Sequence, residues 1–479
     1  MPISCSRNLG AQTREMTDHS PNYFPVANPT LPYWHSEKDQ FRNIRTTPDL
    51  PLETDIVIIG GGYAGAATGY WLYKQSEEVP PNILLLEARY IGSGATGRNG
   101  GHLKPDYYRE YLKFERDMGM EDAASIGNFE HDHLGALKGA IEELNIDCDF
   151  VLTRACNVHL TKKAVDGCLK AMAALKKNPY SKVLDDIQVQ QGRNAQITSI
   201  CEASPVSLTF TAGHLWPYKM VKGFLEFCIS NGMNVQTYTT VHSVDEQESG
   251  YYMVRTNRGS IKCKKVVYAT NAYTAALCPE FEDKIVPVKG TCSHIKTTNR
   301  YKPAPYLSNT YGICRDFSNH EYLINRPDGS VIVGGAKPFY LHNKEEWYKN
   351  VDDSTLFKGN VKEWYQSFMQ ENFYTWKNEE TEVDYLWTGI LGYSVDALPW
   401  IGEIPDSPNK FILAGFHGHG MPRIFLSAKA IAHMILQKVP VQQTSIPKPF
   451  MLTKERLSKA KNTILEDTGY NALRREQKL

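Results

Sequence analysis

The chain has 479 residues, 42% hydrophobic and 22% charged, so it is long enough for two or three globular units with substantial cores. Lys plus Arg and Asp plus Glu both total 53, so no net field attracts nucleic acid or an anionic membrane surface. The longest apolar-looking run, residues 56–72, contains five glycines, too many for a membrane span. We therefore expect neither a nucleic-acid nor a membrane partner.

Ten cysteines are scattered along the chain without a C-x-x-C pair, and no apolar secretory segment opens it. This pattern indicates a reducing compartment, and we expect a cytoplasmic protein without a metal site. The last three residues, Gln477, Lys478 and Leu479, resemble a peroxisomal tripeptide except at Gln477, where small residues are usual. A peroxisomal location therefore stands as the alternative.

A glycine-rich turn between an apolar strand and a helix organises the chain. The run over residues 55–59 predicts a buried parallel strand, and Gly60, Gly62 and Gly65 follow with the spacing G-x-G-x-x-G. Such glycines allow a tight turn, a close approach to a pyrophosphate, and packing of the next helix, whose N-terminal N–H groups face the anion. A second apolar strand ends at Glu87, 22 residues beyond Gly65, where a carboxylate that accepts ribose hydroxyls is expected. The sequence predicts a dinucleotide site.

Two more glycine-rich loops indicate contact with a ligand. Residues 92–102 contain so many helix-breaking or left-handed-tolerant residues that a loop lying against a ligand explains them best. Near the end of the chain, the apolar run 411–414 leads into the glycine turn 415–420, and Pro422 is expected at the first position of a helix that runs to about Gln437. That helix would present a positive dipole end and free N–H groups.

The remaining periodicity predicts the other elements. Residues 1–50 are polar and aperiodic and indicate a flexible start followed by an arm, near Trp34, that packs on the body. The strand over 265–269 exits into a small-residue turn, and Pro327-Asp-Gly329 predicts a hairpin. Helices are expected over residues 123–144, 163–177, 218–231, 352–373 and 453–466.

Four of these stretches together resemble the FAD-dependent glycine/D-amino-acid oxidase family, which includes sarcosine oxidase-like and γ-glutamylputrescine oxidase-like flavoenzymes. They are residues 55–87, 94–101, 268–273 and 415–420. Residues 387–402 also resemble the strand and loop before the family's last flavin-binding turn. The resemblance covers about residues 54–436. From Gly418 on, the sequence resembles that of fungal members of the family most.

The resemblance implies an α/β architecture with a Rossmann-type FAD-binding domain and a discontinuous, mainly antiparallel-sheet substrate domain that roofs the flavin. The FAD-binding domain would gather residues 51–120, 205–285 and 385–440. The substrate domain would take residues 121–204 and 286–384. Residues 1–50 would form an N-terminal arm and residues 441–479 a C-terminal tail.

The resemblance also implies which residues bind FAD. Those at the pyrophosphate and adenosine ribose would be Gly60, Gly61, Gly62, Tyr63, Ala64, Gly65, Glu87, Ala88 and Arg89. Those along the pyrophosphate, ribityl chain and isoalloxazine would be Gly94, Ala95, Thr96, Arg98, Asn99, Gly100, Gly101 and His102. Val241 would meet the adenine, and Thr270 and Asn271 would lie near the phosphates.

The last glycine turn would face the flavin pyrimidine through Gly415, Phe416, His417, Gly418, His419, Gly420 and Met421. A helix N-terminus there would stabilise the negative charge of reduced flavin. Some relatives attach the flavin covalently through a Cys or a His, and those positions correspond here to Gly389 and Arg98. The resemblance therefore implies non-covalent FAD.

The implied reaction is oxidation of a carbon–nitrogen bond. Hydride passes from the carbon next to an amine nitrogen to flavin N5, the imine hydrolyses, and oxygen or another acceptor reoxidises the flavin, with hydrogen peroxide as the product of the oxygen reaction. The cofactor does the difficult chemistry, so the protein needs to hold a neutral amine over N5. Oxygen is the expected acceptor.

Five side chains are candidates for a direct role, and each has a plainer interpretation. His417 and His419 would keep the amine neutral or hold the flavin, or would simply pack and cap the helix. Lys289 would promote oxygen reduction, or would be a solvated lysine at a strand end. Arg326 would reach the site from the roof or belong to the turn beside it. Tyr393 would border the substrate or pack in the core.

The substrate prediction depends on one substitution. Members that oxidise amino acids typically carry W-x-x-x-R-P before the last flavin turn, and the Arg grips the substrate carboxylate. Here Leu391 occupies that position after Trp387. A buried carboxylate without a cation costs several kcal/mol, so simple α-amino acids should be poor substrates. The alternative is an α-amino-acid oxidase in which Arg326 or Lys289 supplies the grip.

Two other functions compete with amine oxidation. An NAD-dependent or monooxygenase-type Rossmann enzyme would share the first glycine motif and would not need the glycine turn near the C-terminus. A flavoprotein without turnover would bind FAD as a structural or regulatory module. The visible spectrum distinguishes the first of these, and bleaching by an amine distinguishes the second.

Overall fold

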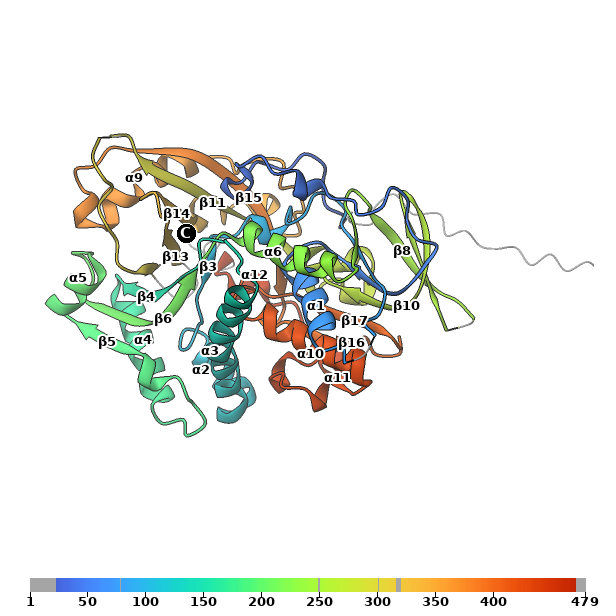
Figure 1. Cartoon of the computed structure of the whole chain (residues 1–479). Helices are drawn as coiled ribbons and strands as arrows, with labels where there is room; N and C mark the ends of the chain where they lie inside the picture. The colour runs from blue at the N-terminus through green and yellow to red at the C-terminus, as the bar shows by residue number, and fades with distance from the viewer. Residues whose placement is uncertain (1–22, 78, 249, 300, 316–319, 471–479) are drawn as a thin grey trace, which may run out of the picture.

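The computed structural model describes residues 23–77, 79–248, 250–299, 301–315 and 320–470 (Figure 1). Two large sheets, one of eight strands and one of nine, form its frame. The chain passes between them several times, so each sheet collects strands that are distant in sequence. The first 22 residues, predicted as part of a flexible start, and the tripeptide 477–479 lie outside the described residues.

The first sheet carries the predicted nucleotide-binding motif. Its strand order is β16-β17-β10-β1-β2-β7, and β9 and β8 continue from β10. Pairing is parallel from β17 through β7, and β16 runs antiparallel to β17. The strand β1 is buried from Ile56 to Ile59, which accounts for its unbroken apolar run. The strands are β1 (Glu53–Ile59), β2 (Ile83–Leu86), β7 (Asn234–Gln236), β8 (Val241–Glu246), β9 (Tyr252–Thr256), β10 (Gly259–Tyr268), β16 (Trp400–Glu403) and β17 (Lys410–Ala414).

Three helices complete this half of the molecule. Helix α1 (Tyr63–Lys74) packs against β1, α10 (Ile424–Gln437) against β17, and α6 (Pro217–Ser230) against α1. Figure 1 shows α1 and α10 together beside β16 and β17. The strand-glycine-helix units at both ends of the sequence therefore meet at one sheet, which confirms the Rossmann-type architecture.

The second sheet is mainly antiparallel, as predicted for the substrate side. Its order is β15-β11-β14-β13-β12-β4-β6-β3, with β5 on β6, and β12 and β4 are the parallel pair among these ladders. The strands are β3 (His102–Leu103), β4 (Val151–His159), β5 (Gln188–Gln191), β6 (Val206–His214), β11 (Ile285–Thr297), β12 (Thr310–Cys314), β13 (His320–Asn325), β14 (Val331–Gly335) and β15 (Thr381–Ser394). Strands β6 and β15 both belong to this second sheet. The predicted boundaries, in contrast, place β6 wholly and β15 mostly in the FAD-binding domain. The domain boundaries remain a prediction.

Helices pack around the second sheet and between the two sheets. Helix α9 packs against β15, α4 against β4, and α3 against both α2 and α10. These helices are α2 (Tyr111–Met118), α3 (Met120–Glu143), α4 (Lys162–Leu175), α5 (Arg193–Ser199), α7 (Lys337–Tyr340), α8 (Lys344–Trp347) and α9 (Val361–Asn372). The three helices predicted near residues 123, 163 and 218 are confirmed as α3, α4 and α6, and the hairpin at 327–329 is confirmed as β13–β14.

Three helix predictions are wrong in part. The helix expected over 352–373 forms from Val361 on, because Asp352 accepts from the backbone N–H of Ser354 in a local turn and Gly359 adopts φ 87°. The last glycine turn continues through Pro422, and its helix begins at Ile424. The charged segment 453–466 splits into α11 (Lys454–Lys459) and α12 (Ile464–Asp467), because Ala460 is extended.

The predicted arm packs on the body. Trp34 is fully buried, and its Nε1 donates to the carbonyl of Asn99 at 2.6 Å. The nine described cysteines are free and buried. Among the described residues, no helix combines the length and the apolar composition that crossing a bilayer requires.

Candidate functional site

A cavity of about 650 Å³ lies where the carboxyl ends of β1, β2, β10 and β17 face strands β11, β13 and β15. Most of the predicted site residues line it: Gly60, Gly62, Tyr63, Ala64, Glu87, Ala88, Arg89, Gly94, Ala95, Thr96, Arg98, Asn99, Gly100, His102, Val241, Thr270, Asn271, Lys289, Gly389, Tyr393, Phe416, His417, Gly418, His419, Gly420 and Met421. Gly61, Gly65, Gly101, Gly415 and Arg326 are not in the cavity wall. Loops far apart in sequence therefore converge on one space.

The first glycine turn leaves no room for larger residues. Gly60 adopts φ 118°, and a Cβ there would lie 2.6 Å from the carbonyl oxygen of Ala269. A Cβ on Gly65 would lie 2.0 Å from the carbonyl oxygen of Gly60, so the third glycine sets how closely α1 approaches β1. Helix α1 begins after Gly62 without a side-chain cap, and the N–H of Tyr63 donates to Thr96 Oγ1 at 2.9 Å. The helix N-terminus is thus directed at the cavity wall formed by the second glycine loop.

Glu87 ties the end of β2 to the glycine turn. Its Oε2 accepts from the N–H of Gly61 at 2.7 Å, and its Oε1 accepts from the N–H of Arg89 at 2.8 Å. Ser93 Oγ also donates to Oε1 at 3.5 Å, so Oε2 is the oxygen that still has a lone pair available. The side chain lines the cavity at the position expected for a ribose-binding carboxylate.

A buried cluster of charges fixes the second glycine loop. Arg89 donates through Nη1 and Nη2 to Asp353 at 2.9 and 3.1 Å, and Arg98 Nε lies 3.3 Å from the same carboxylate. Asp353 is fully buried. Arg98 also donates to the carbonyls of Ser93 and Thr388 at 2.7 and 2.6 Å. Asp353 was not predicted as a site residue, because the segment around it was expected to be helical.

The N-terminal arm crosses the same loop. Arg98 Nη2 donates to the carbonyl of Thr30 at 2.5 Å, and Arg89 Nη1 donates to the carbonyl of Val26 at 3.1 Å. Phe24 and Pro25 line the cavity. The arm therefore forms part of the cavity wall.

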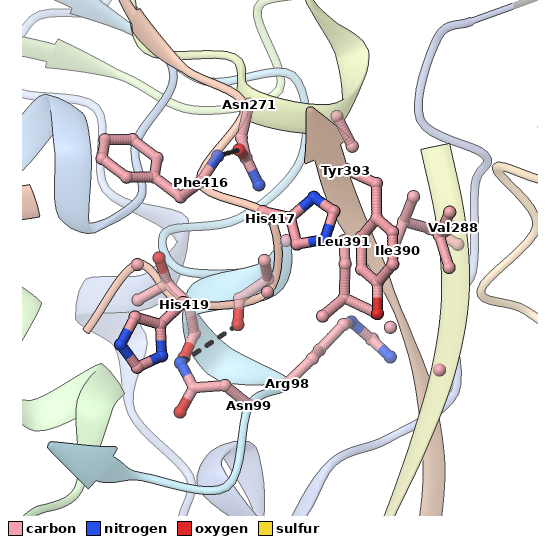
Figure 2. A pocket seen from close by; sticks show the side chains of 18 of the residues that line it. Arg98, Asn99, Asn271, Val288, Ile390, Leu391, Tyr393, Phe416, His417 and His419 are labelled. Atoms are coloured by element: carbon pink, nitrogen blue, oxygen red, sulfur yellow. Dashed lines mark hydrogen bonds between the residues drawn. The ribbon is translucent and has the colours of Figure 1, made fainter. Parts of the chain in front are cut away.

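The last glycine turn is shaped by Asn271 (Figure 2). Its Oδ1 accepts from the N–H groups of Gly415 and Phe416 at 3.0 and 3.3 Å. Asn271, His417 and Gly418 adopt φ of 44°, 53° and 73°, so this turn depends on left-handed backbone. The glycine at 418 supplies that conformation without strain.

His417 is a neutral imidazole held over Tyr393. The two rings stack with centroids 4.2 Å apart, and His417 Nδ1 lies 2.9 Å from the carbonyl of Ser394. A carbonyl accepts, so Nδ1 carries the proton and Nε2 is left as an acceptor. Burial lowers the pKa of His417 to about 3. Figure 2 shows both rings beside Leu391.

His419 is hydrogen-bonded to Glu130, a buried carboxylate on α3. Its Nε2 lies 3.0 Å from Glu130 Oε2, and Arg423 Nε donates to Glu130 Oε1 at 2.6 Å. Burial alone would raise the pKa of Glu130, but His419 and Arg423 outweigh burial and lower this pKa to about 2. Glu130 is a functional candidate that the sequence did not indicate, because its partners are almost three hundred residues away.

Lys289 and Arg326 both point to other partners. Lys289 is 3% exposed within β11, which corrects the interpretation of a solvated strand-end lysine, and its Nζ donates to Thr355 Oγ1 at 2.9 Å. Lys289 pairs with Ile390, so strand alternation puts it on the opposite face from Leu391. Arg326 donates to Asp149 at 2.5 Å and packs among aromatic rings of the arm, outside the cavity wall.

Gly389 leaves no space for a cysteine. A Cβ at this position would lie 2.8 Å from Arg98 Cβ. The two positions at which the family resemblance places the linking residue are therefore in contact here, and neither carries a Cys or a His.

One end of the cavity was not predicted at all. It is lined by side chains of the segment that follows β3, of α2, of α7 and of α12: Lys104, Asp106, Arg109, Glu110, Lys113, Lys337 and Asp467. His320 and Tyr322 on β13 face the same space. These residues carry no motif, and folding alone brings them together.

A sequence model described as FAD dependent oxidoreductase matches residues 55–434. The chain belongs to this family. It is 24% identical over 429 residues to gamma-glutamylputrescine oxidoreductase of Escherichia coli strain K12, covering 88% of this chain and 90% of that protein. It is 21% identical over 415 residues to glycine oxidase of Bacillus subtilis strain 168, covering 80% and 93%.

Solved structures share the fold. Glycine oxidase from Geobacillus kaustophilus aligns with a TM-score of 0.66 at 18% identity, covering 84% of this chain and 99% of that chain. L-proline dehydrogenase from P. horikoshii aligns with a TM-score of 0.64 at 19% identity, covering 88% and 99%.

FAD is the cofactor of this FAD-dependent oxidoreductase. The structure fits that cofactor: a Cβ at Gly60 would collide with backbone, and a Cβ at Gly62 would lie 2.9 Å from Thr96 Oγ1. A Cβ on Gly94 would meet nothing within 4 Å, so this loop borders open space. A cradle of backbone, an uncapped helix N-terminus and Glu87 together match a dinucleotide.

Proposed function

We propose that this enzyme oxidises an amine that lacks an α-carboxylate, with molecular oxygen as the acceptor. When bound, FAD supplies the hydride acceptor at N5 for the carbon next to the amine nitrogen, which leaves an imine that water hydrolyses. The observation that carries the proposal is Leu391. It lines the cavity next to Gly418. The family resemblance implies that amino-acid-oxidising members have their carboxylate-binding arginine at this position.

The two cations that could replace that arginine do not favour α-amino acids. Arg326 is hydrogen-bonded to Asp149 outside the cavity wall. Lys289 lines the cavity, but it is hydrogen-bonded to Thr355 and lies on the opposite face of the strand pair from Leu391. A carboxylate beside Leu391 would lose its hydration without gaining a charged partner. An uncharged group on the carbon next to the amine meets no such penalty.

The chain's own residues have separate roles in this proposal. The backbone of the first two glycine loops and Glu87 bind the nucleotide, and Asn271 holds the last glycine turn against the flavin pyrimidine. His417 offers a neutral Nε2 that accepts a hydrogen bond from an N–H of the amine. Tyr393 fixes that ring by stacking. Glu130 and Arg423 hold His419 and fix the far side of the turn.

Oxygen as acceptor is supported by relatives that are named oxidases, glycine oxidase among them. A reducing compartment is supported by the nine free cysteines of the described part. We place the enzyme in the cytoplasm, with a peroxisome as the alternative that Gln477-Lys478-Leu479 raises.

A substrate panel tests the proposal. Primary and secondary amines, D- and L-amino acids, glycine and sarcosine are mixed anaerobically with the holoprotein, and bleaching of the flavin is followed. Peroxide release in air then distinguishes an oxidase from a dehydrogenase. We expect amines to bleach the flavin faster than any α-amino acid. Fastest bleaching by glycine, sarcosine or a D-amino acid would refute the proposal, and bleaching by no compound would indicate a flavin-binding protein without turnover.

A further inference from the structure

The unpredicted end of the cavity contains more cationic than anionic side chains. Lys104, Arg109, Lys113 and Lys337 line it, against three carboxylates, Asp106, Glu110 and Asp467. Lys113 lies 3.3 Å from Asp467, and Arg109 lies 3.8 Å from Asp106, so two of these charges face a carboxylate. Among the described residues of this wall, cations and carboxylates number four and three.

Arg109 and His320 are hydrogen-bonded to each other at this end of the cavity. Arg109 Nη2 lies 3.0 Å from His320 Nδ1 and donates to it, so this imidazole is neutral. Burial holds the pKa of His320 well below its usual value, and Arg109, Lys337 and Lys104 all add to that effect. Arg109, Lys104 and Lys337 line the same cavity wall as His320.

Lys104 differs from the buried arginines around the cavity. Arg89 and Arg98 share Asp353, and Arg423 pairs with Glu130. Lys104 Nζ instead donates to the amide oxygen of Asn157 at 3.1 Å, and no carboxylate of the described residues lies within 4.0 Å of it. An ammonium has three donors, so a partly buried lysine with an amide as its partner is set up to receive an anion.

The route from this end to the flavin-facing turn is aromatic. Tyr322 and Tyr340 line the cavity, and Tyr322 lies over Gly100, where a Cβ would come within 2.1 Å of its ring. Lys104 follows His102 by two residues of nearly extended chain, about 6–7 Å. A methylene chain fits against tyrosine rings, and a charged end does not.

We propose that Lys104, Arg109 and Lys337 bind a carboxylate at the far end of the substrate, so that the substrate is an ω-amino carboxylic acid or its N-substituted derivative. This inference rests on the proposed amine oxidation. It places the acid group beyond the tyrosines and the amine at the flavin, and it explains how an enzyme with Leu391 in place of the arginine can still select an acidic substrate.

The test compares matched substrates in the holoenzyme. ω-Aminocarboxylic acids of increasing length are compared with the n-alkylamines of the same length by anaerobic bleaching and steady-state kinetics. We expect the acids to have the lower KM, with an optimum length. Lys104→Gln should raise KM for the best acid about 10- to 100-fold with a much smaller effect on the alkylamine, because one charge-assisted hydrogen bond is lost. Lys104→Arg should retain part of the preference for the acid over the alkylamine.

Controls separate the possible failures. Lys162→Gln, at an exposed lysine of α4 paired with Asp166, should behave as wild type. The carboxylate subsite would be overturned if acids and alkylamines had equal KM values, or if Lys104→Gln raised KM equally for both. Either result would leave the proposed amine oxidation standing. Preferred turnover of an aminoalkyl phosphonate would assign the subsite to a dianion and overturn the proposal as stated.

A binding measurement does not depend on turnover. Calorimetric titration of the holoenzyme with hexanoate should show binding that Lys104→Gln abolishes and Lys162→Gln retains. If no amine bleaches the flavin but hexanoate binds in this way, the proposed reaction fails and the subsite stands. If hexanoate binds neither the wild-type holoenzyme nor Lys104→Gln, or binds these two equally, the carboxylate subsite is refuted.

Discussion

The carboxylate of Asp353 joins its own segment to residues 89–98, which are more than 250 residues away in sequence, so its removal should destabilise the cofactor site. The carboxylate is fully buried and accepts from Arg89 at 2.9 and 3.1 Å, with Arg98 Nε at 3.3 Å. In Asp353→Ala the two guanidinium groups would face each other without a counterion. Breaking a buried ion pair from one side costs about 3–5 kcal/mol. Arg98 keeps its bonds to the carbonyls of Ser93 and Thr388, so the loss should stay within that range.

Urea titration of the holoprotein measures this effect through flavin release, together with protein fluorescence. Asp352→Ala is the matched control, because Asp352 is partly exposed and accepts from Ser354 and Thr355 in a local turn. It should lose about 0.5–1.5 kcal/mol, the net value of an ordinary hydrogen bond. Equal losses in the two variants would refute the reasoning. An Asp353→Ala variant as stable as the wild type would show that the charge cluster contributes nothing to holding the loop.

Three further predictions follow from the site. Leu391→Arg should raise kcat/KM for α-amino acids about 10- to 100-fold relative to an alkylamine, because a charge-assisted pair becomes available; an unchanged ratio would show that position 391 does not face the substrate. Gly389→Cys should give a low yield of folded protein, because its Cβ would lie 2.8 Å from Arg98 Cβ, and denaturation should release all of the flavin from it. Flavin that stays covalently attached to the denatured variant would contradict this. Stability should fall as the pH drops below about 6.5, by about 1.4 kcal/mol per pH unit for each proton taken up on unfolding, and a flat stability profile from pH 7 to 4.5 would argue against it.

The sign of the pH effect comes from histidines that burial keeps neutral. Their pKa values in the folded state are about 3 or 4, against 6.5 in a model peptide, so the unfolded chain binds more protons between those values. The stability is fully present above about pH 6.5 and is lost progressively as the pH falls toward 4. The histidines are His35, His133, His159, His214 and His417.

The parts of the fold that the sequence predicted are local. The strand-glycine-helix unit at residues 55–74 is encoded by consecutive residues, and so are the helices α3, α4 and α6, whose apolar periodicity matches the observed bounds within a few positions. The second glycine loop was identifiable because many unusual residues stand together. In each case the signal and the structure occupy the same short stretch of chain.

The parts that the sequence did not predict depend on distant partners. Asp353 pairs with Arg89 across 264 residues, and Glu130 pairs with Arg423 across 293, so nothing beside either carboxylate indicates its role. The segment from Asp352 to Gly359 has helical composition, but the side chain of Asp352 bonds to the local backbone instead. Lys289 looked solvated because its burial comes from the segment around Thr355, which follows much later in the chain.

Release of the cofactor tests the central claim most directly. The purified protein should be yellow, and acid precipitation should leave one equivalent of FAD per chain in the supernatant and a colourless pellet. Gly62→Val should be colourless or insoluble, because a Cβ there already lies 2.9 Å from Thr96 Oγ1. A colourless wild type that FAD does not reconstitute, or flavin that stays in the pellet, would contradict non-covalent binding of FAD in this cavity.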